Sequence, residues 1–496
     1  MSKRRKPWYR ARNVILLTLV AGLIWIAWVV LGAMNARAGN AIDYAAKLNE
    51  LARANQPGDP DAPNRWDDYL SLLERNAGVL NSFIPKGENQ PDPVAWEQFV
   101  YGFRPDYPML KGDAFAVQLD RAQGCVDAVR AAGIFDRIDS FLEPMPVYWE
   151  TSGIDWTDDS SVRKIALMRR IPEGPLVDCI LSMHRGDAAN AAQSYERVVA
   201  LAHINARQAS LLGCLAGRTN WIVAHGRVRE HMLAHDFDES VCDAMLGAML
   251  DAEQPPIMIG VEAEKLFMLD LVQRCYTDDG RSDGAFLPNA FRKFELGTDN
   301  RLIDSMPGHP VSNLAGVMFT RKAETIEKLD AYFDEINAAC GQRTHALRMQ
   351  YIERARAMRT QWTDRDPVLQ CMTELFEMMV ASLGTPVVEH DGTVLTLAIL
   401  RYHHLHGEPP PDLGALVPGV LDRLPTDPFA PDGRYRYKRI EPSMQDPRSF
   451  ILYSVGTDGV DDGGVSPRNL YDALAVDGPG GDFVFNPNPI ASDVDQ

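Results

Sequence analysis

Apolar residues form one long uninterrupted run near the start of the chain. Val14 to Met34 reads VILLTLVAGLIWIAWVVLGAM, which is 21 residues without a charge. At a rise of about 1.5 Å per residue, a helix of this length spans a bilayer core of roughly 30 Å. We therefore predict a transmembrane helix over 14–34.

Helical periodicity dominates the much longer stretch that follows. Trp66, Tyr69, Leu70 and Leu73 recur at the spacing of an amphipathic helix. The same pattern fills most of 162–275 and 320–382, whereas 277–312 is polar, rich in Gly, Asp and Pro, and is predicted to be a long loop. Because no fixed period recurs, we predict a large α-helical body over 40–384 without strict repeats.

Residues 385–476 have a different pattern. A helix is predicted over 393–404, and the two alternating runs 435–440 and 450–455 predict a β-hairpin. The remaining residues, 477–496, are rich in Gly, Pro and Asp and are predicted to be a flexible tail. The expected fold class is therefore mainly α, with a small α+β module near the C-terminus.

Charge around the apolar run predicts its orientation in a membrane. The preceding segment carries six basic residues and no acid, and only Arg37 follows closely. The basic residues are Lys3, Arg4, Arg5, Lys6, Arg10 and Arg12. The excess of positive charge predicts a cytoplasmic tail over 1–13 and a periplasmic or otherwise exoplasmic location for 40–496.

A cleaved signal peptide is the alternative interpretation of this N-terminal segment. Ala36-Arg37-Ala38 resembles a cleavage site with small residues at both ends. Apolar regions of cleaved signals run to about 7–15 residues, however, so the longer run favours an uncleaved anchor. The expected partner of 14–34 is the lipid bilayer.

The rest of the chain is strongly acidic. The full sequence has 50 Lys and Arg against 68 Asp and Glu, a net charge of −18; without the six basic residues of the tail, 44 face 68, a balance of −24. Such an excess repels nucleic acid, so no nucleic-acid partner is expected. The seven cysteines contain no C-x-x-C pair and are predicted to be buried free thiols, with disulfides as the alternative.

The stretch 393–472 resembles the C-terminal part of the major pseudopilins of the type II secretion system. The resemblance is carried by three motifs: LPTDPF over 424–429, YRY over 435–437 and YSVGTDG over 453–459. It implies a small α+β fold and a calcium-binding loop after the last motif. Pseudopilins also carry a Glu early in their apolar helix, whereas 14–34 has no carboxylate.

The helical region resembles large uncharacterised envelope proteins of planctomycete-type bacteria. The matching pieces are GDAANAAQSYERVVALAHI over 186–204, the Pro255-Pro256 break and EAEKLFMLDLVQ over 262–273. The resemblance implies an envelope location and a helical architecture. It implies no activity.

The acidic loop after 453–459 is the best candidate for chemistry. Carried over from the pseudopilins, Asp458, Asp461 or Asp462, and Ser466 are the expected calcium ligands, with Asp472 as a further candidate. Hard cations favour several oxygens on a glycine-containing loop, and the adjacent Asp461 and Asp462 repel each other unless a positive charge lies between them. The alternative is an Asp/Gly turn held by side-chain-to-backbone hydrogen bonds.

A second candidate is the histidine cluster His403, His404 and His406. Two imidazoles one turn apart suit a metal ion, but a helix is predicted to end at Gly407, where histidines also suit the helix dipole. The capping interpretation is favoured. No nucleophile elbow, H-E-x-x-H, Walker or dinucleotide motif occurs, so the protein is not expected to be an enzyme.

Together these patterns predict a membrane-anchored, non-enzymatic envelope scaffold or interaction protein with a calcium-binding module. Its expected partners are the bilayer and other envelope or secretion-system proteins. Two alternatives stay open. In the first, the protein would be an accessory component of a type II secretion or type IV pilus-like system. In the second, it would be an exoplasmic hydrolase whose catalytic motif is unrecognised.

Overall fold

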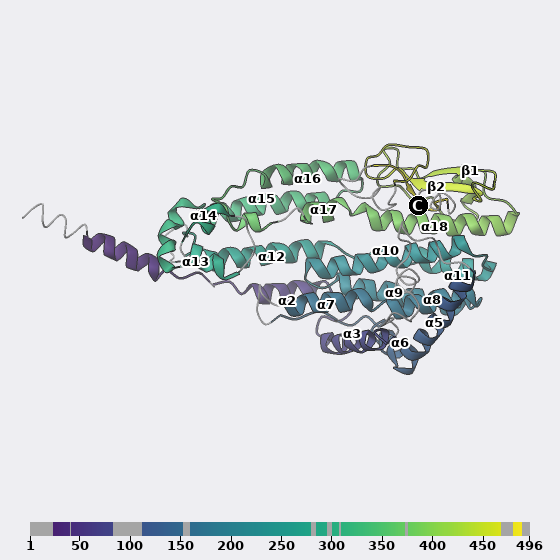
Figure 1. Ribbon diagram of the computed structural model, residues 1–496, viewed down its shortest axis with the longest axis horizontal. Coiled ribbons are helices and arrows are strands. Elements are labelled where there is room, and N and C mark those ends of the chain that lie inside the picture. Colours follow the sequence, from purple (N-terminus) through teal and green to yellow (C-terminus); the bar gives the residue numbers. More distant parts are fainter. Residues whose placement is uncertain are drawn as a thin grey trace, which may run out of the picture.

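The computed structural model describes residues 23–39, 41–82, 112–151, 159–278, 284–294, 300–306, 309–372, 375–467 and 480–488. Within these ranges the chain is mainly α-helical, as its periodicity predicted. Most helices run along the long axis of an elongated molecule, and a small antiparallel sheet lies at the end opposite the first helix (Figure 1).

The first half of the body consists of α2 (Tyr44–Ala54), α3 (Trp66–Leu80), α5 (Gly112–Ala131), α6 (Ile134–Asp139), α7 (Asp159–Arg170), α8 (Glu173–His184), α9 (Ala188–Ala206), α10 (Leu211–Ala234), α11 (Glu239–Leu250) and α12 (Met258–Cys275). The second half consists of α13 (Pro288–Phe291), α14 (Arg301–Asp304), α15 (Lys322–Cys340), α16 (His345–Arg359), α17 (Leu375–Ala381) and α18 (Gly384–His406), with 3-10 helices η1 (Arg292–Phe294), η2 (Pro310–Met318), η3 (Leu369–Cys371) and η4 (Leu413–Leu416).

The junction between α8 and α9 shows how local sequence sets helix ends. Gly186 adopts a φ of +72°, a conformation that ends a helix readily only with glycine. The side chain of Asp187 then accepts a hydrogen bond from the backbone N–H of Asn190 at 3.2 Å and caps the start of α9. Gly186 and Asp187 thus end one helix and begin the next.

The segment 277–312 differs from its prediction as one long loop. Its described parts contain α13, η1, α14 and the start of η2. Pro288 occupies the first turn of α13, where its missing N–H costs nothing, and Phe286 and Phe291 are buried in the core. Short helical turns thus form where buried aromatic residues interrupt the polar sequence.

Two large clusters of buried side chains hold the body together. One is built on α3, α5 to α11, α18 and the sheet, and the other mainly on α12 to α17. Val388 and Leu395 of α18 belong to the same cluster as Trp66 of α3 and Phe485 near the C-terminus. The hydrophobic core therefore runs across the predicted boundary at residue 385 without a break.

The sheet has the order β1 (Arg436–Arg439), β2 (Phe450–Ser454), β3 (Phe483–Val484), with both pairings antiparallel. The hairpin prediction is confirmed, because β1 pairs with β2 in a register that places Tyr437 opposite Leu452. The helix before it begins at Gly384, nine residues earlier than predicted.

The tail predicted over 477–496 was wrong for residues 480–488. β3 completes the sheet by pairing Val484 with Tyr453, and Phe483, Val484 and Phe485 are buried. Phe485 packs directly on α18 at Gly392, where a Cβ atom would lie 1.9 Å from the Phe485 ring. Burial of these apolar side chains outweighs the local preference of a Gly- and Pro-rich segment for irregular structure.

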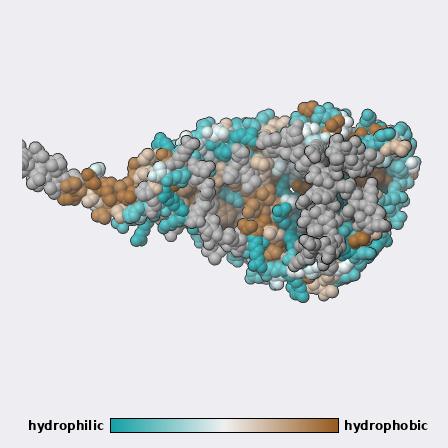
Figure 2. Space-filling view, in the orientation of Figure 1, coloured by the Kyte–Doolittle hydropathy of each residue, from teal (hydrophilic) through white to brown (hydrophobic). Residues whose placement is uncertain are grey.

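Residues 23–34 form a helix that projects from one end of the molecule (Figure 1). Apolar side chains cover it (Figure 2), and Leu23, Trp25 and Trp28 are 66%, 64% and 72% exposed. No helix within the described ranges is long and apolar enough to cross a membrane. The preceding residues of the predicted span, 14–22, and the basic tail 1–13 lie outside the described residues.

Candidate functional site

The loop after β2 carries most of the predicted calcium ligands. We call residues 456–466 the Asp/Gly loop; it contains Asp458, Asp461, Asp462 and Ser466. Asp472 lies outside the described residues. The loop returns toward β3, so that the N–H of Asp482 donates to the backbone carbonyl of Val465 at 3.0 Å.

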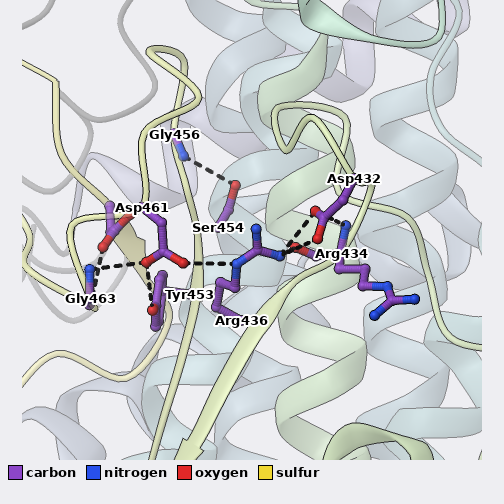
Figure 3. A network of polar contacts seen from close by, with 10 residues as sticks. Asp432, Arg434, Arg436, Tyr453, Ser454, Gly456, Asp461 and Gly463 are labelled. Carbon is purple, nitrogen blue, oxygen red and sulfur yellow. Dashed lines mark hydrogen bonds and ion pairs between the residues drawn. The ribbon is translucent and has the colours of Figure 1, made fainter.

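Asp461 is already paired with a positive charge. Its Oδ2 accepts a hydrogen bond from Nε of Arg436 on β1 at 3.0 Å, and its Oδ1 accepts from the hydroxyl of Tyr453 at 2.9 Å and the N–H of Gly463 at 3.0 Å (Figure 3). Partial burial alone would raise the pKa of Asp461, but these donors hold it below its ordinary value. Arg436 therefore supplies the positive charge that the sequence argument assigned to calcium.

Asp458 holds the loop to the segment before β3. Its Oδ1 accepts from the N–H of Val460 at 3.0 Å, and its Oδ2 accepts from the N–H of Gly481 at 3.1 Å. Gly480 has a φ of +79°, and a Cβ there would lie 2.3 Å from Oδ2 of Asp458. Both are side-chain-to-backbone hydrogen bonds, as the alternative interpretation of the loop requires, and the one from Val460, two residues on, is the bond of an Asx turn.

Asp482 is a functional candidate that the sequence prediction missed. It is fully buried; its Oδ2 accepts from the N–H of Gly464 at 2.6 Å, and its Oδ1 has no hydrogen-bond partner among the described residues. The buried Oγ of Ser466 is also without one there. Burial, with the charges of Asp461 and Asp462, raises the pKa of Asp482 to about 6. The residue was missed because it lies in the segment predicted to be a flexible tail.

Three histidines far from this loop form a tighter group. Among the described residues, His184, His231 and His235 are the one set of three metal-ligating side chains whose ligand atoms all lie within 4.8 Å of one another. His184 ends α8, His231 lies in the last turn of α10, and His235 caps that helix. The available sequence signal was the His231-x-x-x-His235 spacing, which places both rings on one helix face.

The three rings pack edge to face and in parallel. Nε2 of His184 lies 3.2 Å from Nδ1 of His231. The ring of His184 lies 4.6 Å from that of His235, centre to centre, and the rings of His231 and His235 are nearly parallel at 6.0 Å. Phe237 covers the group, 5.0 Å from His184. We call these three residues the histidine cluster.

Burial keeps His184 and His231 uncharged at neutral pH. Desolvation, and then the neighbouring His235, lowers the pKa of His184 to about 4. Desolvation and the guanidinium of Arg227 push the pKa of His231 well below its usual value. Nη2 of Arg227 lies 2.9 Å from Nε2 of His231, and Arg227 also pairs with Glu230. Neutral imidazoles are the form that binds metal ions.

The sequence-predicted histidines at the end of α18 do not join such a group. His403, His404 and His406 lie in the last turn of that helix, where Gly407 has a φ of +79°. Nδ1 of His406 bonds the carbonyl of Tyr402 at 2.9 Å, and the two rings stack at 3.9 Å. The position at the helix end is the one that the capping interpretation requires.

A buried ion pair joins the body to the C-terminal segment. Arg229 of α10 pairs with the fully buried Glu389 of α18 and donates to Oγ1 of Thr393 at 3.1 Å. Its guanidinium lies over the rings of Phe483 and Phe485, at 5.9 and 5.4 Å. Breaking such a pair strands a buried charge, so loss of either partner destabilises the packing of α18 on α10.

The prediction of free thiols is confirmed. All seven cysteines are free, and five are fully buried. Burial raises the pKa of Cys214 to about 12, so this thiol is unreactive at neutral pH. Comparisons with protein-family models, curated proteins and solved structures give no match to this chain.

Proposed function

We propose that the protein is a membrane-anchored, non-enzymatic scaffold or interaction protein of the cell envelope. The observation that carries the proposal is the projecting helix 23–34. Leu23, Ile24, Trp25 and Ile26 are all more than half exposed. Their positions point around the whole helix, because successive residues turn by about 100°. Transfer of a helix that is apolar on every side from water into lipid lowers its free energy.

Charge supports one orientation of this anchor. The tail 1–13 is basic, whereas the remainder of the chain is strongly acidic. Basic residues stay on the cytoplasmic side of a membrane span, and an acidic body is repelled by anionic lipid heads. The proposed arrangement places the helical body on the exoplasmic side, held to the bilayer through its first helix alone.

Flotation with neutral phosphatidylcholine vesicles tests the anchor. Neutral lipid removes the attraction of the basic tail, so the apolar helix alone is measured. The full chain should float with the vesicles, and a variant lacking residues 1–34 should stay at the bottom of the gradient. Ile26→Arg should weaken flotation. Met444→Arg, a matched change at a body residue that is 90% exposed, should leave it unchanged. A shortened variant that still floats would overturn the proposal.

Protease digestion of spheroplasts tests the orientation separately. Protease added outside should reach the body and spare the tail 1–13. A body protected in intact spheroplasts but digested after lysis would contradict the exoplasmic placement while leaving the anchor itself in place.

Calcium binding by the Asp/Gly loop is the second candidate function. The observation that favours it is the pair of buried oxygens without hydrogen-bond partners among the described residues, Oδ1 of Asp482 and Oγ of Ser466. Oxygen donors of this kind suit a hard cation. Asp458 and Asp462 lie on the same loop and could add charge, although their carboxylates and that of Asp482 do not meet within 4.8 Å.

The calcium proposal is tested by melting the full chain in calcium and in chelator. Sites of this type often have dissociation constants on the order of 10⁻⁴–10⁻³ M, so about 10 mM calcium should stabilise the protein by roughly 1.4–2.7 kcal/mol. Asp458→Ala and Asp482→Asn should each abolish that response, and magnesium should substitute poorly. Equal melting temperatures in calcium and chelator would leave the loop as an Asp/Gly turn.

A further inference from the structure

The histidine cluster has the spacing of a metal site built from nitrogen ligands. Zinc binds imidazole nitrogen at about 2.0–2.1 Å with tetrahedral angles, which places neighbouring ligand nitrogens about 3.3 Å apart. Nε2 of His184 and Nδ1 of His231 are 3.2 Å apart, and the third ligand atom, on His235, lies within 4.8 Å of both.

We propose that His184, His231 and His235 bind a divalent transition-metal ion of the zinc type, which ties the end of α8 to the end of α10. All three donors are imidazole nitrogens without a carboxylate among them, a set that suits zinc, cobalt, nickel or copper and not calcium or magnesium. Three protein ligands leave one tetrahedral position for water. The inference does not depend on the membrane anchor or on calcium.

A simple hydrogen bond is the competing explanation for two of the rings. With Arg227 donating to Nε2 of His231, the proton of a neutral His231 resides on Nδ1 and can be donated to Nε2 of His184. That bond requires two histidines. The metal proposal rests on the third, His235, whose ligand atom lies within reach of both others from one turn further along α10.

Arg227 is expected to weaken the affinity of the histidine cluster for a metal ion. A metal ion on Nδ1 of His231 requires the proton to move to Nε2, the atom to which Arg227 now donates. Two donors cannot share that position, so Arg227 must withdraw, and it retains Glu230 as its ion partner. Removing the guanidinium should therefore tighten metal binding, the reverse of its effect on an ordinary structural contact.

Cobalt titration of the full chain provides the direct test. Co²⁺ substitutes for zinc and gives visible absorption bands whose strength reports tetrahedral coordination. The expected result is one equivalent bound, with the bands displaced by zinc and without the near-ultraviolet bands of thiolate ligands. His235→Gln and His184→Gln should each abolish the bands. His403→Gln and His404→Gln, changes at the other histidine group, should leave them intact.

Arg227→Met separates the metal site from a hydrogen-bonded triad. Outer-shell groups typically change metal affinity by about 10–100-fold, so we expect zinc to bind at least about tenfold more tightly to this variant. Circular dichroism checks that each variant folds. For the unaltered protein, zinc should protect His184 and His235 from modification by diethylpyrocarbonate, read by mass spectrometry.

Three results would overturn the proposal. They are failure of the folded full chain to bind a stoichiometric metal ion, binding that survives in His184→Gln/His235→Gln, and unchanged or weaker binding in Arg227→Met. If the histidine variants fail to fold, the protection experiment decides the matter alone, because equal modification with and without zinc excludes ligation by these rings.

Discussion

The Asp/Gly loop and the histidine cluster satisfy their polar groups in different ways. In the loop, Asp458 and Asp461 bond to backbone N–H groups within the loop or near β3, and Arg436 neutralises one of them. In the cluster, rings from two helices meet under Phe237, and their position depends on how α8 packs beside α10. The polar groups of a contiguous motif can form hydrogen bonds with neighbouring residues of the same loop. The residues of a dispersed cluster meet only because the helices that carry them pack together.

The two regions should also respond to pH in opposite directions. The pKa of His184 is lowered to about 4, below the value of 6.5 in an unfolded chain, so its contribution to stability is present above pH 6.5 and is lost as pH falls. The pKa of Asp482 is raised from 3.8 to about 6, so stability is lost as pH rises through that interval. Lowering the pH therefore destabilises the histidine cluster and stabilises the region around Asp482.

The largest expected effect is acid destabilisation through the histidine cluster. Between pH 6.5 and 4 the histidines of the unfolded chain bind protons, whereas the buried rings of the folded protein stay neutral. The lowered pKa of His184 alone corresponds to a loss of at most about 3 kcal/mol in the free energy of unfolding, and to less than that because its ring is partly exposed. His231 acts in the same direction. Denaturant unfolding of His184→Gln should show a shallower loss of stability over this range, and an unchanged slope would contradict the assignment.

Asp482→Asn tests the opposite pH dependence that is expected of the Asp/Gly loop. The amide oxygen can still accept the hydrogen bond from Gly464, whereas the buried charge is gone. Without calcium, the variant should be more stable than the original protein by on the order of 2 kcal/mol above pH 6, and equally stable below about pH 4. Unfolding curves at pH 4 and pH 7.5 measure this, and a loss of stability at the higher pH would show that Asp482 is already stabilised as an anion.

Gly480→Ala should loosen the loop by about 1–2 kcal/mol, because it adds both backbone strain and a collision with Asp458. Gly463→Ala is the matched control. Gly463 has a similar φ of +77°, but a Cβ there meets nothing within 4 Å. The difference in melting temperature between the two variants isolates the contact with Asp458, and equal effects would mean that this contact contributes nothing.

The smallest effect is expected for Arg436→Gln. Its pairs with Asp432 and Asp461 are partly exposed, so their loss should cost less than about 1 kcal/mol and should fade at high salt. The informative measurement is calcium dependence. If Arg436 occupies the place of a cation, the variant should gain more stability from calcium than the original protein does. An identical gain would separate Arg436 from any cation site.

Periodicity predicted most of the fold, and its errors have local causes. The start of α18 was placed too late because Gly384-Thr385-Pro386 resembles a break, although proline is tolerated in the first turn of a helix. β3 was missed because two residues carry no periodic signal. It exists through its pairing with Tyr453 and Ser454 and through burial of Phe483.

In the candidate sites, too, the sequence predicted what neighbouring residues determine and missed what depends on contacts between distant segments. The spacing of the Asp/Gly loop was visible in the sequence, but Arg436, which neutralises Asp461, comes from a neighbouring strand. His184 and His231 are 47 residues apart and meet because two helices end side by side. Nothing in a single sequence reports that meeting, whereas the closely spaced histidines at the end of α18 were conspicuous.

The contact between Gly392 and Phe485 has a consequence for hydrogen exchange. The ring of Phe485 lies against α18 at Gly392, which has no side chain, so it shields the backbone amides around that glycine from water. Those amides can exchange with solvent deuterium only when the ring has lifted and the helix has opened locally. Their exchange rates, read residue by residue, would therefore measure how often the C-terminal strand detaches from the body.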